Sequence, residues 1–199
     1  MRTKTPTKNG GAATKAAARP MPSANHQNCG GDTPRLGYKC AIYPGSFDPP
    51  TLGHLSLVER GLFLFDKIIV AVAENSAKSP FFTTAERVEM LKNSLAEYDQ
   101  SRIEVDSFEG LLVDYARKRE AAAIMRGLRA TGDFEYEFQM ALVNRHLDEA
   151  VQSVFLMTDF RWLYISSSIV KEAASYGADV SAMVPPPVAE RLKAKFAAR

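Results

Sequence analysis

The segment from Tyr43 to His54 has residue types suited to binding a phosphate, and reads Y-P-G-S-F-D-P-P-T-L-G-H. Glycine lets the backbone approach a ligand closely, and a helix N-terminus offers free amides and the positive end of its dipole to an anion. If a helix begins near Gly53, His54 lies in its first turn and faces the same anion. The segment therefore predicts phosphate binding by Thr51, Gly53 and His54 together.

Three consecutive serines form a second candidate phosphate site later in the chain. They lie in the segment W-L-Y-I-S-S-S-I-V-K, which runs from Trp162 to Lys171. One serine is an ordinary helix N-cap, whereas three in succession suit a nest where amides and hydroxyls converge on phosphate oxygens.

Basic residues lie at two further junctions. Arg126 and Arg129 flank Gly127 and Leu128 in the sequence R-G-L-R. The planar guanidinium of arginine makes paired, charge-assisted bonds with phosphate. Lys78 stands in a loop bounded by proline, and taken alone it would be interpreted as a solubilising lysine.

Several functional classes lack their signatures. The dinucleotide fingerprint G-x-G-x-x-G does not follow the first strand candidate, and the P-loop pattern is absent, which disfavours a simple NAD or FAD redox enzyme and a P-loop kinase. The sequence contains no dense cluster of carboxylates, so it does not predict an all-protein metal site. The apolar residues Phe138, Met140, Leu142 and Val143 recur at helical spacing and are interpreted as packing residues.

The elements that must position these residues alternate between strand and helix. We expect strands at 40–43, 68–73, 102–107, 122–126 and 154–157, and helices near 53–65, 84–97, 110–119, 133–149 and 167–176. Thr83 and Glu86 have the spacing of a capping box, and a terminal helix is expected over 188–198. This order predicts an α/β, Rossmann-like, doubly wound five-stranded parallel sheet with a C-terminal helix, whose ligands bind beyond the carboxyl ends of the strands.

Composition supports a folded body behind an unusual N-terminal segment. The chain has 199 residues, 46% hydrophobic and 24% charged, with two cysteines and a net charge of +2. Residues 1–37 hold six basic residues and one acid, with almost no large apolar side chain, so we expect a disordered basic extension followed by one domain over 38–199. The extension is interpreted as an organelle transit peptide, a vector-derived segment or a lineage-specific addition.

The acidic balance of the body disfavours nucleic-acid binding, the short apolar runs disfavour a membrane span, and the two cysteines favour the cytoplasm.

The body from about Cys40 to Lys195 resembles bacterial phosphopantetheine adenylyltransferases of the nucleotidylyltransferase superfamily. T-L-G-H resembles the superfamily signature T/H-x-G-H, and I-S-S-S-I-V-K resembles I-S-[ST]-[ST]-x-[IV]-[RK]. The stretches that resemble this one family are AIYPGSFDPPTLGH, the K-x-P-x-F that begins at Lys78, FEGLLVDYAR, RGLRATGDFEYEFQMALVNRHL and SVFLMTDFRWLYISSSIVKE. The chain departs from the family pattern at three places. These are P-T-L around the first signature, Ser79 where a second lysine is common, and the unmatched N-terminal segment.

The resemblance implies transfer of the adenylyl group of ATP to 4'-phosphopantetheine, which gives dephospho-coenzyme A and pyrophosphate without a covalent enzyme intermediate. It assigns catalysis to His54, Lys78 and Arg126, and phosphopantetheine binding to Ser46, Lys78, Leu112 and Arg126. The ATP-binding residues that it implies are Ser46, Phe47, His54, Gly127, Leu128, Arg129, Glu137, Trp162, Leu163, Tyr164, Ile165, Ser166, Ser167 and Ser168. It also implies Mg²⁺ bound mainly through the ATP phosphates, a homohexamer, and coenzyme A as a feedback inhibitor.

Two alternatives stay open at this point. A related enzyme of the superfamily would use nicotinamide mononucleotide, choline phosphate or glycerol phosphate as its acceptor. A catalytically silent nucleotide-binding or scaffold protein would need neither acceptor nor turnover. The segments R-G-L-R and F-E-G-L favour the phosphopantetheine enzyme, and the retained Ser46, His54, Lys78, Arg126 and Arg129 argue against a silent protein.

Overall fold

The computed structural model describes residues 40–74, 79–129 and 131–198. The predicted extension over residues 1–37 and the loop residue Lys78 therefore lie outside the described residues. The domain boundary near residue 38 stays a prediction.

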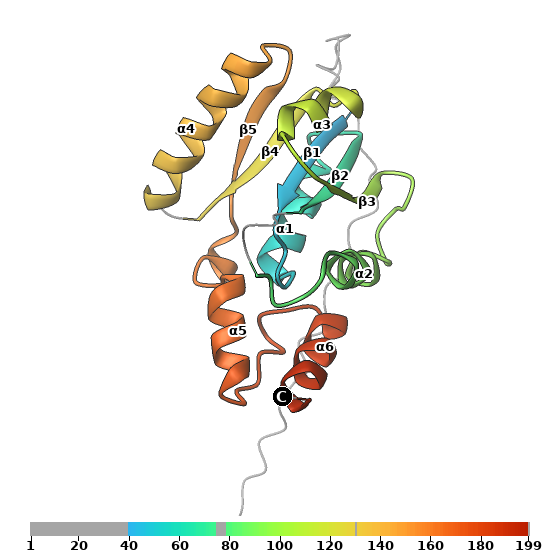
Figure 1. Cartoon of the computed structure of the whole chain (residues 1–199), viewed down its shortest axis with the longest axis vertical. Coiled ribbons are helices and arrows are strands. Elements are labelled where there is room, and N and C mark those ends of the chain that lie inside the picture. The colour runs from blue at the N-terminus through green and yellow to red at the C-terminus, as the bar shows by residue number, and fades with distance from the viewer. Residues whose placement is uncertain (1–39, 75–78, 130, 199) are drawn as a thin grey trace, which may run out of the picture. The chain divides into compact units, whose positions relative to one another are not determined.

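A five-stranded, wholly parallel sheet forms the centre of the described fold (Figure 1). Its spatial order is β3-β2-β1-β4-β5, so the chain reverses direction across the sheet between β1 and β4. The strands are β1 (Cys40–Gly45), β2 (Lys67–Ala73), β3 (Ile103–Phe108), β4 (Ala123–Leu128) and β5 (Gln152–Met157). A doubly wound sheet binds ligands where the strand order reverses, and that point is the gap between the carboxyl ends of β1 and β4.

Helices cover both faces of this sheet, as right-handed crossovers between parallel strands require. The helices are α1 (Leu52–Gly61), α2 (Thr84–Ser94), α3 (Leu112–Lys118), α4 (Thr131–Leu147), α5 (Ser167–Ser175) and α6 (Pro186–Ala197). A short 3-10 helix, Phe160–Trp162, follows β5. Each predicted strand and helix is present, with boundaries that differ by a few residues, and the capping box of Thr83 and Glu86 is confirmed.

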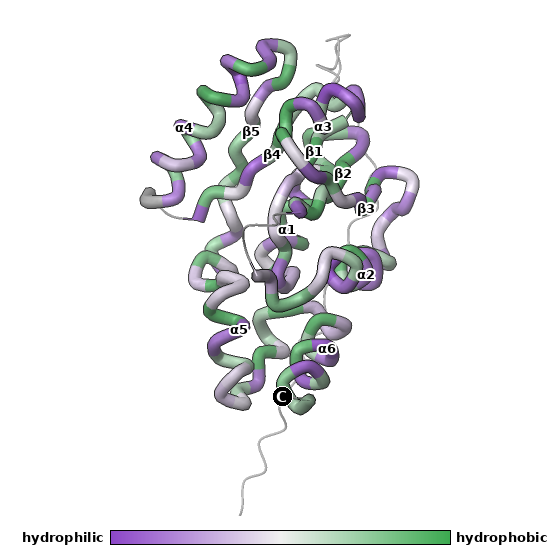
Figure 2. Tube along the Cα trace, in the orientation of Figure 1, coloured by the Kyte–Doolittle hydropathy of each residue, from purple (hydrophilic) through white to green (hydrophobic). Residues whose placement is uncertain are grey.

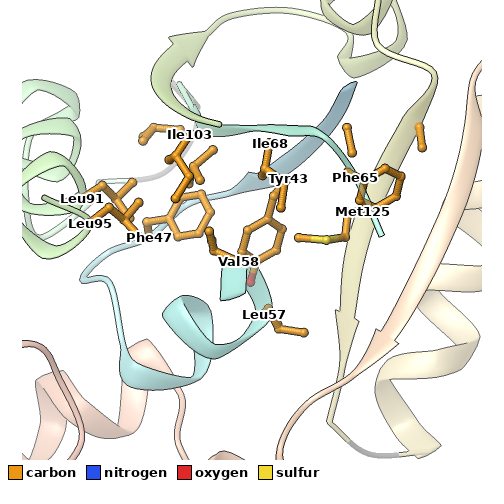
Figure 3. Close-up of a cluster of buried hydrophobic side chains, with 14 residues drawn as sticks. Tyr43, Phe47, Leu57, Val58, Phe65, Ile68, Leu91, Leu95, Ile103 and Met125 are labelled. Atoms are coloured by element: carbon orange, nitrogen blue, oxygen red, sulfur yellow. The ribbon is translucent and has the colours of Figure 1, made fainter. Parts of the chain in front are cut away.

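Alternate residues of the central strands face opposite layers of the core, because side chains in a strand alternate between its two faces. Ala41 and Tyr43 pack with α1 and α2, as do Ile68 and Val70 of β2 (Figure 3). The neighbouring Ile42 belongs to a second cluster on the other face, with Ile69, Ile124 and residues of α3. Strands buried on both faces explain why these segments read as continuous apolar runs.

A third apolar cluster joins the C-terminal helices to the sheet domain. Val170 of α5 and Leu192 of α6 pack with Phe82 and with Met90 of α2. Ile165, which precedes α5, is buried in the same cluster. This packing fixes where α5 begins, and therefore where the three serines lie.

The interpretation of α4 as a packing helix is wrong for part of its surface. Phe138 is 47% exposed, Leu142 53% and Val143 49%, and Met140 is also exposed. Figure 2 shows hydrophobic and hydrophilic residues alternating along this helix. α4 is in contact with β4, β5 and α3, and its Phe134 contacts Phe155 of β5. Apolar residues along the whole length of α4 therefore remain exposed.

A buried arginine joins the loop after β1, the end of β2 and the loop before α2. Arg87 of α2 is 3% exposed, and its guanidinium donates to the carbonyls of Ser46 (2.7 Å), Ala73 (3.2 Å) and Phe82 (3.1 Å). A fourth bond goes to the hydroxyl of Thr84. No sequence pattern distinguishes this residue, because an arginine in an amphipathic helix ordinarily lies on the solvent side.

Replacing Arg87 by methionine should lower the free energy of unfolding by about 3 kcal/mol or more, because each buried acceptor left unpaired costs about 1–3 kcal/mol. Urea denaturation followed by circular dichroism measures this loss. Arg191→Met is the matched control, since Arg191 pairs with Glu89 at an exposed position. The control should change stability by less than about 1 kcal/mol. Equal, small losses in both variants would contradict the bracing role of Arg87.

Candidate nucleotide-binding site

A cavity of about 350 Å³ lies at the carboxyl ends of β1, β4 and β5, where the strand order reverses. The N-terminal turns of α1 and α5 contribute to its wall, so two positive helix ends meet at one cavity. The sequence-predicted site residues that line it are Ser46, Phe47, His54, Arg126, Gly127, Arg129, Glu137, Trp162, Ile165, Ser166, Ser167 and Ser168.

The first signature forms a capping box at the start of α1, with histidine in the place usually held by glutamate or glutamine. The backbone amide of Thr51 donates to Nδ1 of His54 at 2.9 Å, and the amide of His54 lies 3.4 Å from the Thr51 hydroxyl. Because an amide can only donate, Nδ1 is an unprotonated acceptor and the ring proton is on Nε2. The box therefore holds the imidazole in the tautomer that donates from its opposite nitrogen.

The protonation of His54 follows from its surroundings. Burial, and to a smaller extent the positive charge of Arg129, lower the pKa of His54 from its ordinary 6.5 to about 4. The Phe47 ring packs edge-on against the imidazole, with centroids 5.1 Å apart. His54 is therefore neutral at physiological pH, and its contribution to the site is one N–H donor rather than a positive charge.

Close packing around Phe47 restricts the loop after β1. Phe47 has a φ of 47°, in the left-handed region that side-chain-bearing residues seldom adopt, and its side chain is 1% exposed. A Cβ at Gly45 would lie 2.9 Å from the Phe47 ring. Glycine at this position lets the ring lie beneath the backbone, where it supports His54.

The three serines differ in what they do. Ser166 is the N-cap of α5, and its hydroxyl accepts from the amide of Ile169 at 3.1 Å. The hydroxyl of Ser167 donates to the carbonyl of Pro49 at 2.8 Å, which ties the two signatures together. Ser168 is exposed at the cavity. Two of the three hydroxyls thus have an intramolecular partner and keep further hydrogen-bonding capacity, and their binding to a ligand stays a prediction.

Both arginines are oriented by carboxylates of α4. Arg126 forms a two-point pair with Glu137, with 2.6 Å between Nε and Oε2, and donates to the carbonyl of Pro44 at 3.1 Å. Arg129 pairs with Asp133 at 3.1 Å and lies 3.3 Å from the carbonyl of Ile165. A guanidinium has five N–H donors, so each arginine keeps donors for a further anion.

Asp48, in the segment between β1 and α1, links the second signature to the loop before α2, and its role is a functional feature that the sequence did not indicate. The carboxylate is 6% exposed and accepts from the amides of Phe81 (2.9 Å) and Phe82 (2.8 Å), and from the ammonium of Lys171 (2.7 Å). Lys171 is the last residue of the second signature. The sequence carries no signal for this pairing, because the two residues are 123 positions apart.

A second cavity, of about 340 Å³, adjoins the first. The two share Pro44, Gly45, Ser46, Arg126 and Glu137 in their walls. Leu112, a residue predicted to bind phosphopantetheine, lines only this second cavity, together with apolar residues that include Phe108, Met140 and Phe155. Ser46 and Arg126 thus border two neighbouring chambers, one more polar and one more apolar.

Some predicted residues lie elsewhere. Leu128, Leu163 and Tyr164 do not line either cavity, and Lys78 lies outside the described residues. A larger cavity of about 640 Å³, between α5 and α6, contains none of the predicted residues.

Within residues 40–74, 79–129 and 131–198, no three histidine, cysteine, aspartate or glutamate side chains are grouped as a metal site would require. The same ranges contain no helix that is both long and apolar enough to span a bilayer.

Comparisons with known proteins show which family the chain resembles. Residues 42–173 match the cytidylyltransferase-like family model. The phosphopantetheine adenylyltransferase of Desulfosudis oleivorans is 57% identical over 158 residues, which cover 79% of this chain and 93% of the relative. That of Caldanaerobacter subterraneus subsp. tengcongensis is 55% identical over 158 residues, with coverages of 79% and 98%.

A solved structure supports the fold independently. The putative nicotinate-nucleotide adenylyltransferase from Vibrio parahaemolyticus superposes with a TM-score of 0.57 at 19% identity, covering 78% of this chain and 98% of that one. At this identity the likeness concerns the Rossmann-like fold alone. The identities above 50% across almost the whole length of the relatives are the decisive finding: the chain belongs to the phosphopantetheine adenylyltransferase family of nucleotidyltransferases.

Proposed function

We propose that this protein transfers the adenylyl group of ATP to 4'-phosphopantetheine, producing dephospho-coenzyme A and pyrophosphate. The observation that carries the proposal is the pair of adjoining cavities with Ser46 and Arg126 in their shared wall. The cavity between two helix N-termini suits the triphosphate of ATP. The more apolar cavity, lined by Leu112, suits the pantetheine arm, and its phosphate would then meet ATP beside Arg126.

The reaction is a direct in-line displacement. An oxygen of the phosphopantetheine phosphate attacks the α-phosphorus of ATP, the bond from that phosphorus to the bridging oxygen breaks, and pyrophosphate leaves with the electron pair. The attacking group is already ionised, so no general base is needed. Catalysis then depends on positioning two anions and on stabilising the charge that develops, tasks assigned to His54, Lys78 and Arg126.

Magnesium is expected to accompany ATP. Because no carboxylate cluster is present in the described residues, the phosphate oxygens would supply most of its ligands. Bound in this way, the ion would withdraw charge from the phosphates. The residues of the chain would hold the nucleotide through amides, hydroxyls and guanidinium groups.

The acceptor is tested directly by measuring pyrophosphate release from ATP. Release should require 4'-phosphopantetheine, and dephospho-coenzyme A should appear in equal amount. Nicotinamide mononucleotide and choline phosphate serve as the competing acceptors. Faster release with either of these would replace the proposed acceptor, and no release with any of them would favour a silent nucleotide-binding protein.

The neutral state of His54 predicts a specific pH dependence of stability. The unfolded chain binds a proton at His54 below about pH 6.5, whereas the folded protein does so only near pH 4. The unfolded state therefore holds more protons between these values, so this residue makes stability fall as the pH falls from about 6.5 to about 4. His54→Gln retains a capping-box side chain without titrating there. Its loss of stability between pH 7 and pH 4.5, measured by urea denaturation, should be smaller than that of the wild type. Parallel curves would show that His54 titrates normally in the folded protein.

Removing the imidazole should slow the chemical step. His54→Ala is expected to lower kcat by roughly 10² to 10³, as for other lost transition-state donors, and to weaken ATP binding much less. Single-turnover kinetics and thermal melting are measured on the same preparation. If His54 acts only as a cap, the variant would lose about 1 kcal/mol of stability and keep its turnover.

Arg126 is assigned to the acceptor phosphate. Arg126→Ala should raise the KM for phosphopantetheine or lower kcat far more than it raises the KM for ATP. Arg126→Lys should rescue the defect only partly, because a point charge does not reproduce a forked contact. Equal loss of affinity for both substrates would refute this assignment.

We also propose that the protein assembles as a homohexamer, and that coenzyme A inhibits it. The exposed apolar residues of α4 support self-association, because such a surface is costly in water. The number six and the inhibitor rest on family resemblance. Coenzyme A contains the pantetheine and adenylyl groups of the product, which gives it the chemistry to compete for both cavities.

A double substitution on α4 tests the assembly. Phe138→Glu combined with Leu142→Glu should convert the hexamer to smaller species in sedimentation analysis, because charge on an apolar interface opposes burial. Tyr176→Glu is the control, since Tyr176 is 84% exposed and lies at the end of α5. A wild-type protein that sediments as a monomer would contradict the proposed assembly.

A further inference from the structure

Thr158 is the first residue after β5, and its hydroxyl is unpaired. The residue is 7% exposed, and Oγ1 is the one buried side-chain nitrogen or oxygen without a hydrogen-bond partner among the described residues. Its backbone is well fixed, because its amide donates to the carbonyl of Leu128 at 2.8 Å. A buried hydroxyl without a partner raises the free energy of the folded protein, so the group calls for an explanation.

The position of Thr158 explains why its hydroxyl has no partner in the free protein. The residue lines the cavity between the helix N-termini, and it follows β5 beside the end of β4. The lining of the cavity also includes Gly127, Leu57, Trp162 and Ile165. A Cβ at Gly127 would overlap Cδ1 of Leu57, so Leu57 packs directly on the glycine backbone. The cavity is thus lined by backbone and apolar side chains as well as by its arginines.

The anion-binding groups of the cavity are the first turns of α1 and α5 and two arginines. Arg126 belongs to β4 and Arg129 follows it, and carboxylates of α4 pair with both guanidinium groups. These groups suit the phosphates of a nucleotide. A nucleoside is mostly apolar, with a few polar atoms at its edges, and it suits the backbone and apolar part of the lining together with the unpaired hydroxyl of Thr158.

We propose that Thr158 binds the nucleoside part of ATP through a hydrogen bond from or to Oγ1. The inference rests on the proposed function, since it assumes that this cavity takes ATP. A hydroxyl both donates and accepts, and rotation about the Cα–Cβ bond exchanges the positions of Oγ1 and the methyl group. The group that has no partner in the free protein thereby gains one in the complex, so Thr158 is a specificity-determining residue for the nucleoside.

Two substitutions separate the hydroxyl from the shape of the side chain. Thr158→Val has nearly the same shape and lacks the hydroxyl, whereas Thr158→Ser keeps the hydroxyl. Isothermal titration calorimetry is used with three probes, namely ATP, AMP and inorganic tripolyphosphate. Thr158→Val should weaken ATP and AMP by about tenfold and leave tripolyphosphate unchanged, and Thr158→Ser should bind all three within about twofold of the wild type.

Thermal melting of the free proteins gives an independent readout. Thr158→Val should melt at the wild-type temperature or above it, because the substitution removes an unpaired polar group from a buried position. A structural role for the hydroxyl predicts the opposite, a lower melting temperature. Ser94→Ala is the matched control, since Ser94 donates to the carbonyl of Met90 within α2 and does not line the cavity. This control should leave the affinity for ATP unchanged.

The outcomes distinguish the inference from the function on which it rests. Unchanged ATP affinity in Thr158→Val would overturn the inference while leaving the proposed function intact. Equal weakening of tripolyphosphate would also overturn it, because the hydroxyl would then act on the phosphates or on the whole cavity. A wild-type protein that binds no ATP would overturn both.

Discussion

The buried carboxylate of Asp48 is the interaction on which the arrangement of the site depends. It accepts hydrogen bonds from two backbone amides before α2 and from the ammonium of Lys171 on α5. Three chain segments far apart in sequence therefore meet at one side chain. Because the charge is paired and its oxygens are satisfied, it is tolerated in a buried position. Loss of Lys171 would leave an uncompensated charge, and loss of either amide would remove a hydrogen bond from a buried oxygen, so the three segments are held as a unit.

This bracing explains how a cavity made of loops keeps a defined shape. Arg87 holds carbonyls of the loop after β1 and of the end of β2 from one side, and Ser167 holds Pro49 from the other. The capping box of Thr51 then fixes which nitrogen of His54 carries the proton. A donor whose orientation is set before the substrates bind loses little entropy during the reaction, and such preorganisation is the main source of electrostatic catalysis.

Helix α4 contributes both to the cavity and to an exposed apolar surface. Its carboxylates Asp133 and Glu137 orient the two arginines toward the cavity, while Phe138 and Leu142 remain exposed. An assembly that covered the exposed residues would restrict the same helix that positions Arg126. Self-association and acceptor binding would then be linked through one rigid element.

The sequence by itself determined the alternation of strands and helices, because continuous apolar runs and 3.6-residue periodicity are local signals, and the parallel sheet follows from that alternation. It also identified the two signatures that meet at the cavity, since glycine, histidine and clustered serines have few other uses at strand-to-helix junctions. Tertiary structure alone decided how these residues are employed. Whether a serine hydroxyl serves a ligand or the carbonyl of Pro49, and whether Arg126 is free or paired with Glu137, depends on partners distant in the chain. The roles of Asp48, Arg87 and Thr158 were likewise outside the reach of sequence patterns, because burial and hydrogen-bond satisfaction are properties of packed neighbours rather than of residue type.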